Sequence, residues 1–217
     1  FNTHKIVRST VERSGATFTT QEDDFLVSSD SDFHPTDVLE DADGSLLVVD
    51  TGGWFRIGCP TSQVSKPQVL GAIYRVRRAG RSSDNPAGND PRGLAIDWSG
   101  LSAAALSHLL ADARFAVRDR AVAVLARRGE SAVPALRSVL LDDATGTTTR
   151  CAAIWALTRI ESPAARAAVR GALQDKNADV RRSAARSAGL HRDAGALDAL
   201  TPMVTSDDAS VRREAAT

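Results

Sequence analysis

The string Asp50-Thr51-Gly52 directly follows the apolar residues 46–49. Aspartic proteases present a catalytic aspartate in this way, but their chemistry needs two such aspartates that share one proton, because neighbouring carboxylates move each other's pKa values apart. Only one Asp-Thr-Gly occurs in the chain, and Gly53 stands where Ser or Ala usually follows. We therefore interpret Asp50 as a residue that ends a strand where the chain turns.

An acidic segment surrounds this string, since residues 21–50 hold ten Asp and Glu residues and no Lys or Arg. Within it, Asp41-x-Asp43-Gly44 has the form of the beginning of a calcium loop. The Glu that such a loop requires at its twelfth position would fall on Gly52, so an EF-hand is excluded. Two interpretations of the segment stay open, an irregular cation site and an acidic surface in water.

The histidines and cysteines do not indicate a metal site. His108 and His191 have no Cys, carboxylate or second His at ligand spacing on the same face. Cys59 and Cys151 lie too far apart for a local zinc knuckle, and there is no C-x-x-C-H haem motif. They could pair with each other, pair with residues outside this sequence, or be free. We predict no metal bound by the chain itself.

The elements around Asp50 are predicted to be β-strands, because from residue 15 to 78 apolar residues alternate or form short runs between turns. The clearest strands are ATFTT, PTDVLED, SLLVVD and AIYRVRR. Residues 41–44 supply the Asp and Gly of a tight hairpin turn. The strand at 46–49 is apolar on both faces, so we expect it to be buried between neighbouring sheets.

A loop and then a helical repeat follow these strands. Residues 78–93 are rich in Pro, Gly and Ser, which indicates a loop. From residue 101 the sequence repeats at steps of 32, 31 and 31 residues, with second helices predicted at 132–141, 165–174 and 196–204. An arginine keeps the register: Arg118, Arg150, Arg181 and Arg212. This pattern resembles the short bacterial HEAT-like repeat, which stacks helix pairs into a solenoid.

The recurrent arginine has two interpretations, a row of anion-binding groups or a structural ladder. The resemblance favours the ladder, because an acid lies six residues before two of the arginines, and HEAT repeats use this spacing to tie successive loops together. The predicted members of the ladder are Asp112, Arg118, Arg150, Asp175, Arg181 and Arg212.

Charge and hydropathy bear on two further classes of partner, nucleic acids and membranes. The 217-residue chain has 27 Lys and Arg and 27 Asp and Glu. Residues 1–80 hold 8 cations and 11 anions, leaving 19 and 16 for the rest, so neither half is basic enough to indicate nucleic acid. HEAT folds that act on DNA or attach bilin pigments remain alternatives. No run of about 18 apolar residues occurs, so no membrane-spanning segment is predicted.

Residues 32–78 resemble the last blade of the β-propeller in large exported proteins related to soluble pyrroloquinoline-quinone sugar dehydrogenases. In these proteins a strand of the type Phe33-x-Pro35-x-Asp37-Val38 leads through an Asp-Gly hairpin to an apolar strand that ends in Asp. The resemblance implies a periplasmic or otherwise exported parent with a sugar or alcohol substrate. Pyrroloquinoline quinone, calcium or a c-type haem would belong to that parent, with no cofactor in this chain.

The resemblance also supplies candidate site residues. It places His34, Asp37 and Asp50 nearest the central channel, as candidate catalytic groups; the alternative is that the aspartates bond backbone N–H groups at turns and His34 lies on the surface. Trp54, Phe55 and Arg56 lie in an insertion that would be either a recognition loop or a surface packed on a neighbouring blade.

We therefore expect an α+β fragment of a longer protein. Residues 1–78 would form a partial, antiparallel β-propeller blade, 79–100 a linker, and 101–217 an α-solenoid of HEAT-like helix pairs that binds a protein partner. Two functions follow for the parent. One is sugar or alcohol oxidation with a quinone or haem partner, and the other is a non-catalytic scaffold that binds protein or polysaccharide.

Overall fold

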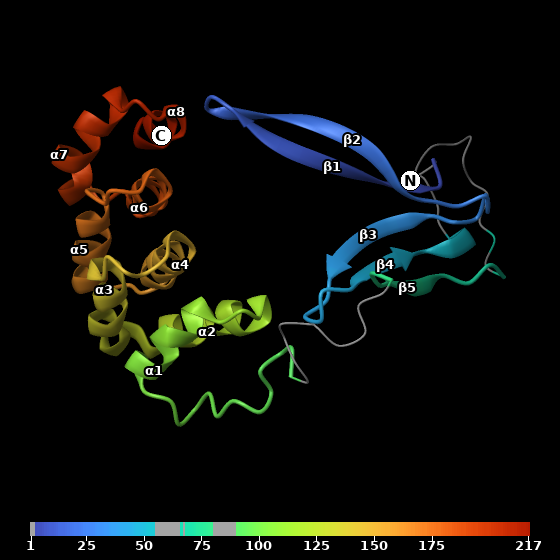
Figure 1. Cartoon of the computed structure of the whole chain (residues 1–217), viewed down its shortest axis with the longest axis horizontal. Helices are drawn as coiled ribbons and strands as arrows, with labels where there is room; N and C mark the ends of the chain where they lie inside the picture. Colours follow the sequence, from blue (N-terminus) through green and yellow to red (C-terminus); the bar gives the residue numbers. More distant parts are fainter. Residues whose placement is uncertain (1–2, 55–65, 67, 80–89) are drawn as a thin grey trace. The chain divides into compact units, whose positions relative to one another are not determined.

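The computed structural model describes residues 3–54, 66, 68–79 and 90–217 (Figure 1). By their contacts the residues group into two compact units. The first comprises residues 1–12 and 18–88, and the second comprises residues 13–17 and 89–217. Strands form the first unit and helices form most of the second.

A long two-stranded sheet comes first in the chain. It consists of β1 (Lys5–Ser14) and β2 (Thr17–Val27), and Gly15 occupies the tight turn between them with φ +60°. Most side chains of both strands are exposed. The predicted strand ATFTT lies in β2. The sequence pattern does not mark β1, because its apolar residues do not alternate regularly.

The second sheet is antiparallel and contains three strands in chain order. The predicted turn at residues 41–44 joins its first two strands: the N–H of Asp41 donates to the carbonyl of Ser45, and Gly44 has φ +77°. These contacts confirm the predicted hairpin. The strands are β3 (Pro35–Glu40), β4 (Leu46–Asp50) and β5 (Ala72–Val76), and Val48 of β4 pairs with Val38 and Tyr74.

The central strand β4 is less buried than its sequence predicts. The sequence predicted that residues 46–49 are buried between neighbouring sheets. In the structure Val48 is fully buried, but Leu46, Leu47 and Val49 are only half-buried. The half-buried residues include Leu46 on one face of the strand and Leu47 and Val49 on the other, so both faces remain partly accessible. The chain thus combines small antiparallel sheets with helical repeats in an α+β fold.

The second unit is built from helix pairs. Side-chain oxygens of Ser102, Ser162, Asn177 and Asp208 accept backbone N–H groups where four of the helices begin. Pro163 is the first residue of the helix that Ser162 caps, a position at which proline is favoured. The helices are α1 (Ala103–His108), α2 (Phe115–Arg128), α3 (Val133–Leu141), α4 (Thr147–Thr158), α5 (Pro163–Ala172), α6 (Ala178–Leu190), α7 (Leu197–Leu200) and α8 (Ala209–Ala215).

The helices bury one continuous apolar core. Helices α2, α4, α6 and α8 pack side by side in succession, and α3 and α5 form a second row against them (Figure 1). Small alanines on the facing surfaces allow this close packing. The largest fully buried side chains in this unit include Leu106, Leu110, Leu125, Leu136, Ile154, Leu157 and Leu173.

The third pair departs from the predicted helix at residues 196–204. Helix α7 ends at Leu200, and a 3₁₀ helix, Thr201–Thr205, continues the chain. Pro202 has no backbone N–H to donate, so it cannot continue the hydrogen bonds of the regular helix.

Part of the segment predicted as a linker packs on the helices. Trp98 is buried in the helical core, its indole N–H donates to the carbonyl of Gly93 at 2.8 Å, and the guanidinium of Arg120 lies over its ring. Residues 90–100 therefore belong with the helical unit. In the part of the chain that the structure describes, no helix has the length and apolar character to cross a membrane.

Candidate functional site

A groove with a volume of about 940 Å³ lies between the second helices of two successive pairs, α3 and α5. Its walls are mainly apolar or small side chains, and one of them, Leu141, is 71% exposed at the rim. Grooves of this size and composition are typical of binding sites. Representative lining residues are Val133, Leu140, Leu141, Ala164, Ala168 and Gly171.

Local interactions hold α5, one of the two walls, against the end of α4. The hydroxyl of Ser162 caps the beginning of α5 by accepting from the N–H of Ala165. The guanidinium of Arg166 on α5 donates to the carbonyls of Leu157 and Ile160 at the end of α4. These bonds satisfy carbonyls that a helix end leaves unpaired, and they fix the angle between α4 and α5.

A buried ion pair forms the floor of the groove. The Nη1 of Arg150 donates to Oδ2 of Asp175 at 2.9 Å, and the two side chains are 6% and 7% exposed. The other carboxylate oxygen of Asp175 accepts from the N–H of Asn177 at 2.8 Å. The Nε of Arg150 has no hydrogen-bond partner among the described residues.

Further charged groups lie around the groove. Lys176 pairs with Asp143 at 2.6 Å in an exposed position, and this contact lowers the pKa of Asp143. Glu130 and Arg137 line the groove seven residues apart on the α3 side. No ion pair involves Arg137 in the described part of the chain. The exposed guanidinium of Arg137 therefore remains available as a donor in the groove.

The groove residues have the character of a binding surface. The hydroxyl of Ser138, which lines the groove, donates a hydrogen bond to the carbonyl of Pro134. Across the described ranges, no three His, Cys, Asp or Glu side chains come together as metal ligands. The arrangement can hold an apolar group on its walls and an acceptor beside Arg137.

Comparison with known families decides what the helix pairs are. The HEAT-repeat family matches residues 102–167 and again 145–217. The chain belongs to the HEAT-repeat family. The predicted resemblance of the helical half is thereby confirmed, and the groove lies between the second helices of two adjacent HEAT repeats.

Solved structures resemble the chain more distantly. Human deoxyhypusine hydroxylase in complex with glycerol is 23% identical, with a TM-score of 0.45, over 63% of this chain and 47% of that chain. An engineered protein is 20% identical, with a TM-score of 0.32, over 52% of this chain and 59% of that chain. The chain thus spans about half the length of these proteins. The search of curated proteins found no match.

Three of the four predicted ladder arginines bond the loop before their own HEAT repeat. Each donates to the backbone carbonyls six and five residues earlier: Arg118 to Asp112 and Ala113, Arg181 to Asp175 and Lys176, and Arg212 to Ser206 and Asp207. The carboxylate of Asp112 instead binds Arg114, which lowers the pKa of Asp112.

Arg150 is the exception, because it reaches the next repeat. Its partner Asp175 accepts from Arg150 through the carboxylate and from Arg181 through the backbone carbonyl. Asp175 therefore connects the first helices of two successive repeats. It also places the guanidinium of Arg150 at the floor of the groove.

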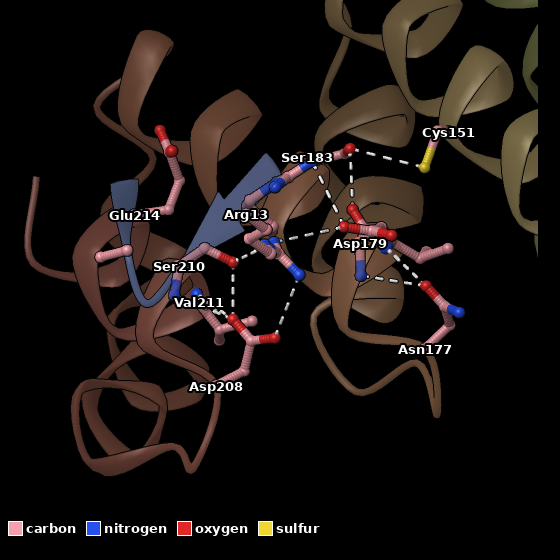
Figure 2. A network of polar contacts seen from close by, with 12 residues as sticks. Arg13, Cys151, Asn177, Asp179, Ser183, Asp208, Ser210, Val211 and Glu214 are labelled. Carbon is pink, nitrogen blue, oxygen red and sulfur yellow. Dashed lines mark hydrogen bonds and ion pairs between the residues drawn. The ribbon is translucent and has the colours of Figure 1, made fainter. Parts of the chain in front are cut away.

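A second polar network lies at the beginnings of α6 and α8 (Figure 2). Asn177 caps α6, and Asp208 caps α8 by accepting from the N–H groups of Ser210 and Val211. The guanidinium of Arg13, which groups with the helical unit, lies 3.7 Å from Asp179 and 3.6 Å from Asp208. These contacts serve helix capping and packing.

The caps determine how Asp208 titrates. The hydroxyl of Ser210, then the backbone N–H groups and Arg13, lower the pKa of Asp208 from 3.8 to about 2. We expect Asp208→Ala to lower the free energy of unfolding by about 1 kcal/mol near neutral pH, because it removes an N-cap. Since the folded pKa lies below the unfolded one, this contribution is complete above pH 3.8 and is lost as the pH falls toward about 2.

Urea unfolding of the full chain, followed by far-ultraviolet circular dichroism across this pH range, measures the effect. Asp208→Asn is the matched control, since Asn caps helices as well as Asp but does not titrate. The control is expected to keep most of the neutral-pH stability. A difference between wild type and the Ala variant that stays constant down to low pH would contradict this account of the cap.

The candidate residues of the strand unit bond backbone groups. Asp50, 7% exposed, accepts from the N–H groups of His34 and Gly52, both at 2.9 Å. Asp37 accepts from the N–H of Val38, and Nδ1 of His34 lies 3.0 Å from the carbonyl of Gly52. The structure thus brings His34 and Asp50 together at the end of β4, with Asp37 in β3 paired opposite Val49.

The acidic turn has a cation of its own. Arg75 of β5 contacts the carboxylates of Asp41 and Asp43 at 2.7 and 3.4 Å. The hydroxyl of Ser45 is the largest cause that lowers the pKa of Asp43, and Arg75 adds to it. Arg75 therefore supplies a positive charge to the two carboxylates of this turn.

Some predicted residues have no described surroundings. Phe55 and Arg56 of the predicted recognition loop, and Cys59, lie outside the described residues, and Trp54 is described only as the last residue of the 3₁₀ helix Gly52–Trp54. Cys151 is free and half-buried. His191 contacts the carbonyl of Thr158 at 2.8 Å.

Sequence reasoning did not single out most of the groove residues. Arg137 and Leu141 are one helical turn apart on α3, and the small residues Ala164, Ala168 and Gly171 follow helical spacing on α5. The sequence signal was limited to a large apolar residue at the end of one helix and small residues at helical spacing on another. Neither feature by itself indicates that the two helices face a shared groove.

Proposed function

We propose that the chain is a non-catalytic scaffold whose HEAT repeats bind a protein partner through the groove between α3 and α5. The observation that carries the proposal is the groove itself, which combines apolar walls, an exposed Leu141 and a buried guanidinium at the floor.

Physical chemistry supports this function. Each HEAT repeat packs only on its neighbours, so a short solenoid keeps an extended surface available for partners. A concave site with mainly apolar walls is typical of binding surfaces, and Leu141 extends the apolar walls of this groove to its rim. A partner that covers Leu141 would remove its apolar surface from water and so gain binding free energy.

Site-specific photocrosslinking in the native host tests the proposal. A photoreactive amino acid replaces Arg137 in the groove, and a matched variant carries it at Arg127, an exposed residue of α2 that does not line the groove. We expect one defined protein adduct at position 137 and none of it at 127. The same adducts at both positions, or none at 137, would refute the proposal.

A second candidate rests on the antiparallel sheet β3–β4–β5. We propose that this sheet is part of the last propeller blade of an exported parent that oxidises a sugar or alcohol. Its support is the chain-order pairing of the three strands and the position of Asp50 at the end of the central one. Pyrroloquinoline quinone, calcium or c-type haem would then reside in the parent, in the periplasm.

The absorption spectrum of the parent protein, purified from its native host, tests this second candidate. Reduction of a quinone or haem band when sugars or alcohols are added would support the redox function. A protein without any cofactor band would leave the scaffold as the function of the whole protein.

A further inference from the structure

We infer that the HEAT repeats carry a second protein-binding surface, on the outer face of their first helices α2, α4 and α6. Its partner is an acidic segment whose carboxylates bond the guanidinium groups of Arg127 and Arg159 and the indole N–H of Trp155. None of these three residues lines the α3–α5 groove, so one scaffold can hold two partners.

The outer face consists of the residues five and nine positions after the ladder arginines Arg118, Arg150 and Arg181. Residues four apart lie on the same side of a helix, and α2, α4 and α6 pack side by side, with axes about 8–10 Å apart (Figure 1). No residue of this face belongs to the apolar core or lines the α3–α5 groove. Its members are Ala123, Arg127, Trp155, Arg159, Arg186 and Leu190.

The cations at the ends of α2 and α4 have no acid beside them on this face. Arg127 and Arg159 are exposed and form no ion pair in the described part of the chain. Of the acids that follow the two helices, Glu130 lines the α3–α5 groove, and Glu161 acts on the guanidinium of α5 that bonds the end of α4. Asp119 lies eight residues before Arg127, which is about 12 Å along the helix. The two guanidinium groups therefore favour an anion supplied from outside.

The same face already binds one carboxylate at its α6 end. Nη1 of Arg186 donates to Oε1 of Glu214 at 2.9 Å, and Glu214 comes from α8, the first helix of the next repeat. Glu214 follows its ladder arginine by two residues, and at this position α4 and α6 hold Ala152 and Ser183 instead. In these repeats no acid of the chain takes the place of Glu214, so a partner's carboxylate can approach.

Trp155 gives the face a hydrogen-bond donor and an apolar surface. It is half-buried and lies one helical turn before Arg159. Its indole N–H has no partner among the described residues, and it is not one of their buried unpaired atoms, so it reaches the surface. The indole N–H of Trp98, in contrast, donates to the carbonyl of Gly93. A tryptophan with an accessible polar end is typical of interfaces.

The composition of the face favours a protein over another polyanion. Protein interfaces are enriched in arginine and tryptophan and depleted in lysine, and the outer face has three arginines, one tryptophan and no lysine. Leu190, 60% exposed and one turn after Arg186, adds apolar surface that a protein side chain can cover. The whole chain has no net charge, so it lacks the long-range attraction with which basic proteins bind nucleic acids.

Binding of synthetic peptides to the full chain tests the inference. The probe is a fluorescein-labelled, alanine-rich peptide of about 15 residues with two Glu seven positions apart, about 10 Å at the helical rise, and one Leu between them. The matched peptide carries Gln in place of both Glu. Fluorescence anisotropy is expected to show binding of the Glu peptide, at least about tenfold weaker binding of the Gln peptide, and weakening with added salt.

Variants of the chain locate the binding site. Arg127→Gln and Arg159→Gln change exposed residues, and each is expected to weaken binding of the Glu peptide by about three- to tenfold. The unlabelled Glu peptide should change the tryptophan fluorescence of wild type, and Trp155→Phe should lose this change. Arg137→Gln is the matched control, because Arg137 is exposed in the α3–α5 groove, and this variant should bind as wild type does.

Each other outcome overturns the inference. Equal binding of the two peptides, no binding of either, or unchanged binding by both Arg127→Gln and Arg159→Gln would exclude the carboxylate contacts. Weaker binding by Arg137→Gln alone would place the peptide in the groove. An oligodeoxythymidylate or an oligogalacturonate that binds more tightly than the Glu peptide at the same salt concentration would assign the face to another class of polymer. The crosslink at position 137 tests the groove separately, so failure at either surface can be told from failure at the other.

Discussion

Asp175→Ala is expected to lower the free energy of unfolding of the HEAT repeats by about 3–5 kcal/mol. The substitution leaves the guanidinium of Arg150, 6% exposed, without its counterion. It also removes the acceptor for the N–H of Asn177, next to the beginning of α6. Breaking a buried pair on one side is costly because the remaining charge stays out of water. Urea unfolding of the full chain, followed by far-ultraviolet circular dichroism, measures the loss.

The double variant Arg150→Met with Asp175→Asn is the matched control. It removes both charges, and the Asn oxygen can still accept from the N–H of Asn177. Replacing both members of a buried pair is often close to neutral, so we expect this variant to lie within about 1–2 kcal/mol of wild type. A single variant that loses less than about 1 kcal/mol would mean that Arg150 reaches water or another partner when Asp175 is absent.

Leu157→Ala is expected to cost about 3–5 kcal/mol. Leu157 is completely buried in α4, the helix that packs against α2, α3, α5 and α6. Truncation removes apolar contacts and leaves a cavity that the surrounding helices fill only in part. Because HEAT repeats are coupled only through their neighbours, the loss in a central repeat should also broaden the unfolding transition.

Thermal and urea unfolding of Leu157→Ala and Leu190→Ala compare the core with the surface. Leu190, at the end of α6, is 60% exposed, so its replacement should change the free energy of unfolding by no more than about 0.5 kcal/mol. Similar losses for both variants would show that burial in α4 does not determine the cost, against the packing described above.

The helical half of the fold could be predicted because its information is local and repeated. A period of 31 or 32 residues, arginines in constant phase and helix-forming alanines all indicate helix pairs before any contact is known. The hairpin at residues 41–44 was also predictable, because Asp and Gly tolerate the backbone angles of a tight turn. Both features depend on neighbours in the sequence.

Less of the candidate site could be predicted. Arg118, Arg150, Arg181 and Arg212 occupy one sequence phase, yet three bond their own preceding loops and only Arg150 crosses to the next repeat. Because the four arginines hold equivalent positions in their repeats, the spacing predicts the same kind of acceptor for each. Which acceptor each one finds depends on how adjacent loops lie in space, and this spacing carries no such information.

The sequence by itself determined that residues 101–217 form repeated helix pairs and that Asp50 ends a strand at a turn, because helical periodicity and turn chemistry act over a few residues. Only the tertiary structure decided that α3 and α5 share a groove with Arg150 at its floor. Packing places residues from separate repeats, such as Arg137, Arg150 and Gly171, around one space. That arrangement depends on the angle between helices, which the buried side chains of the whole unit set together.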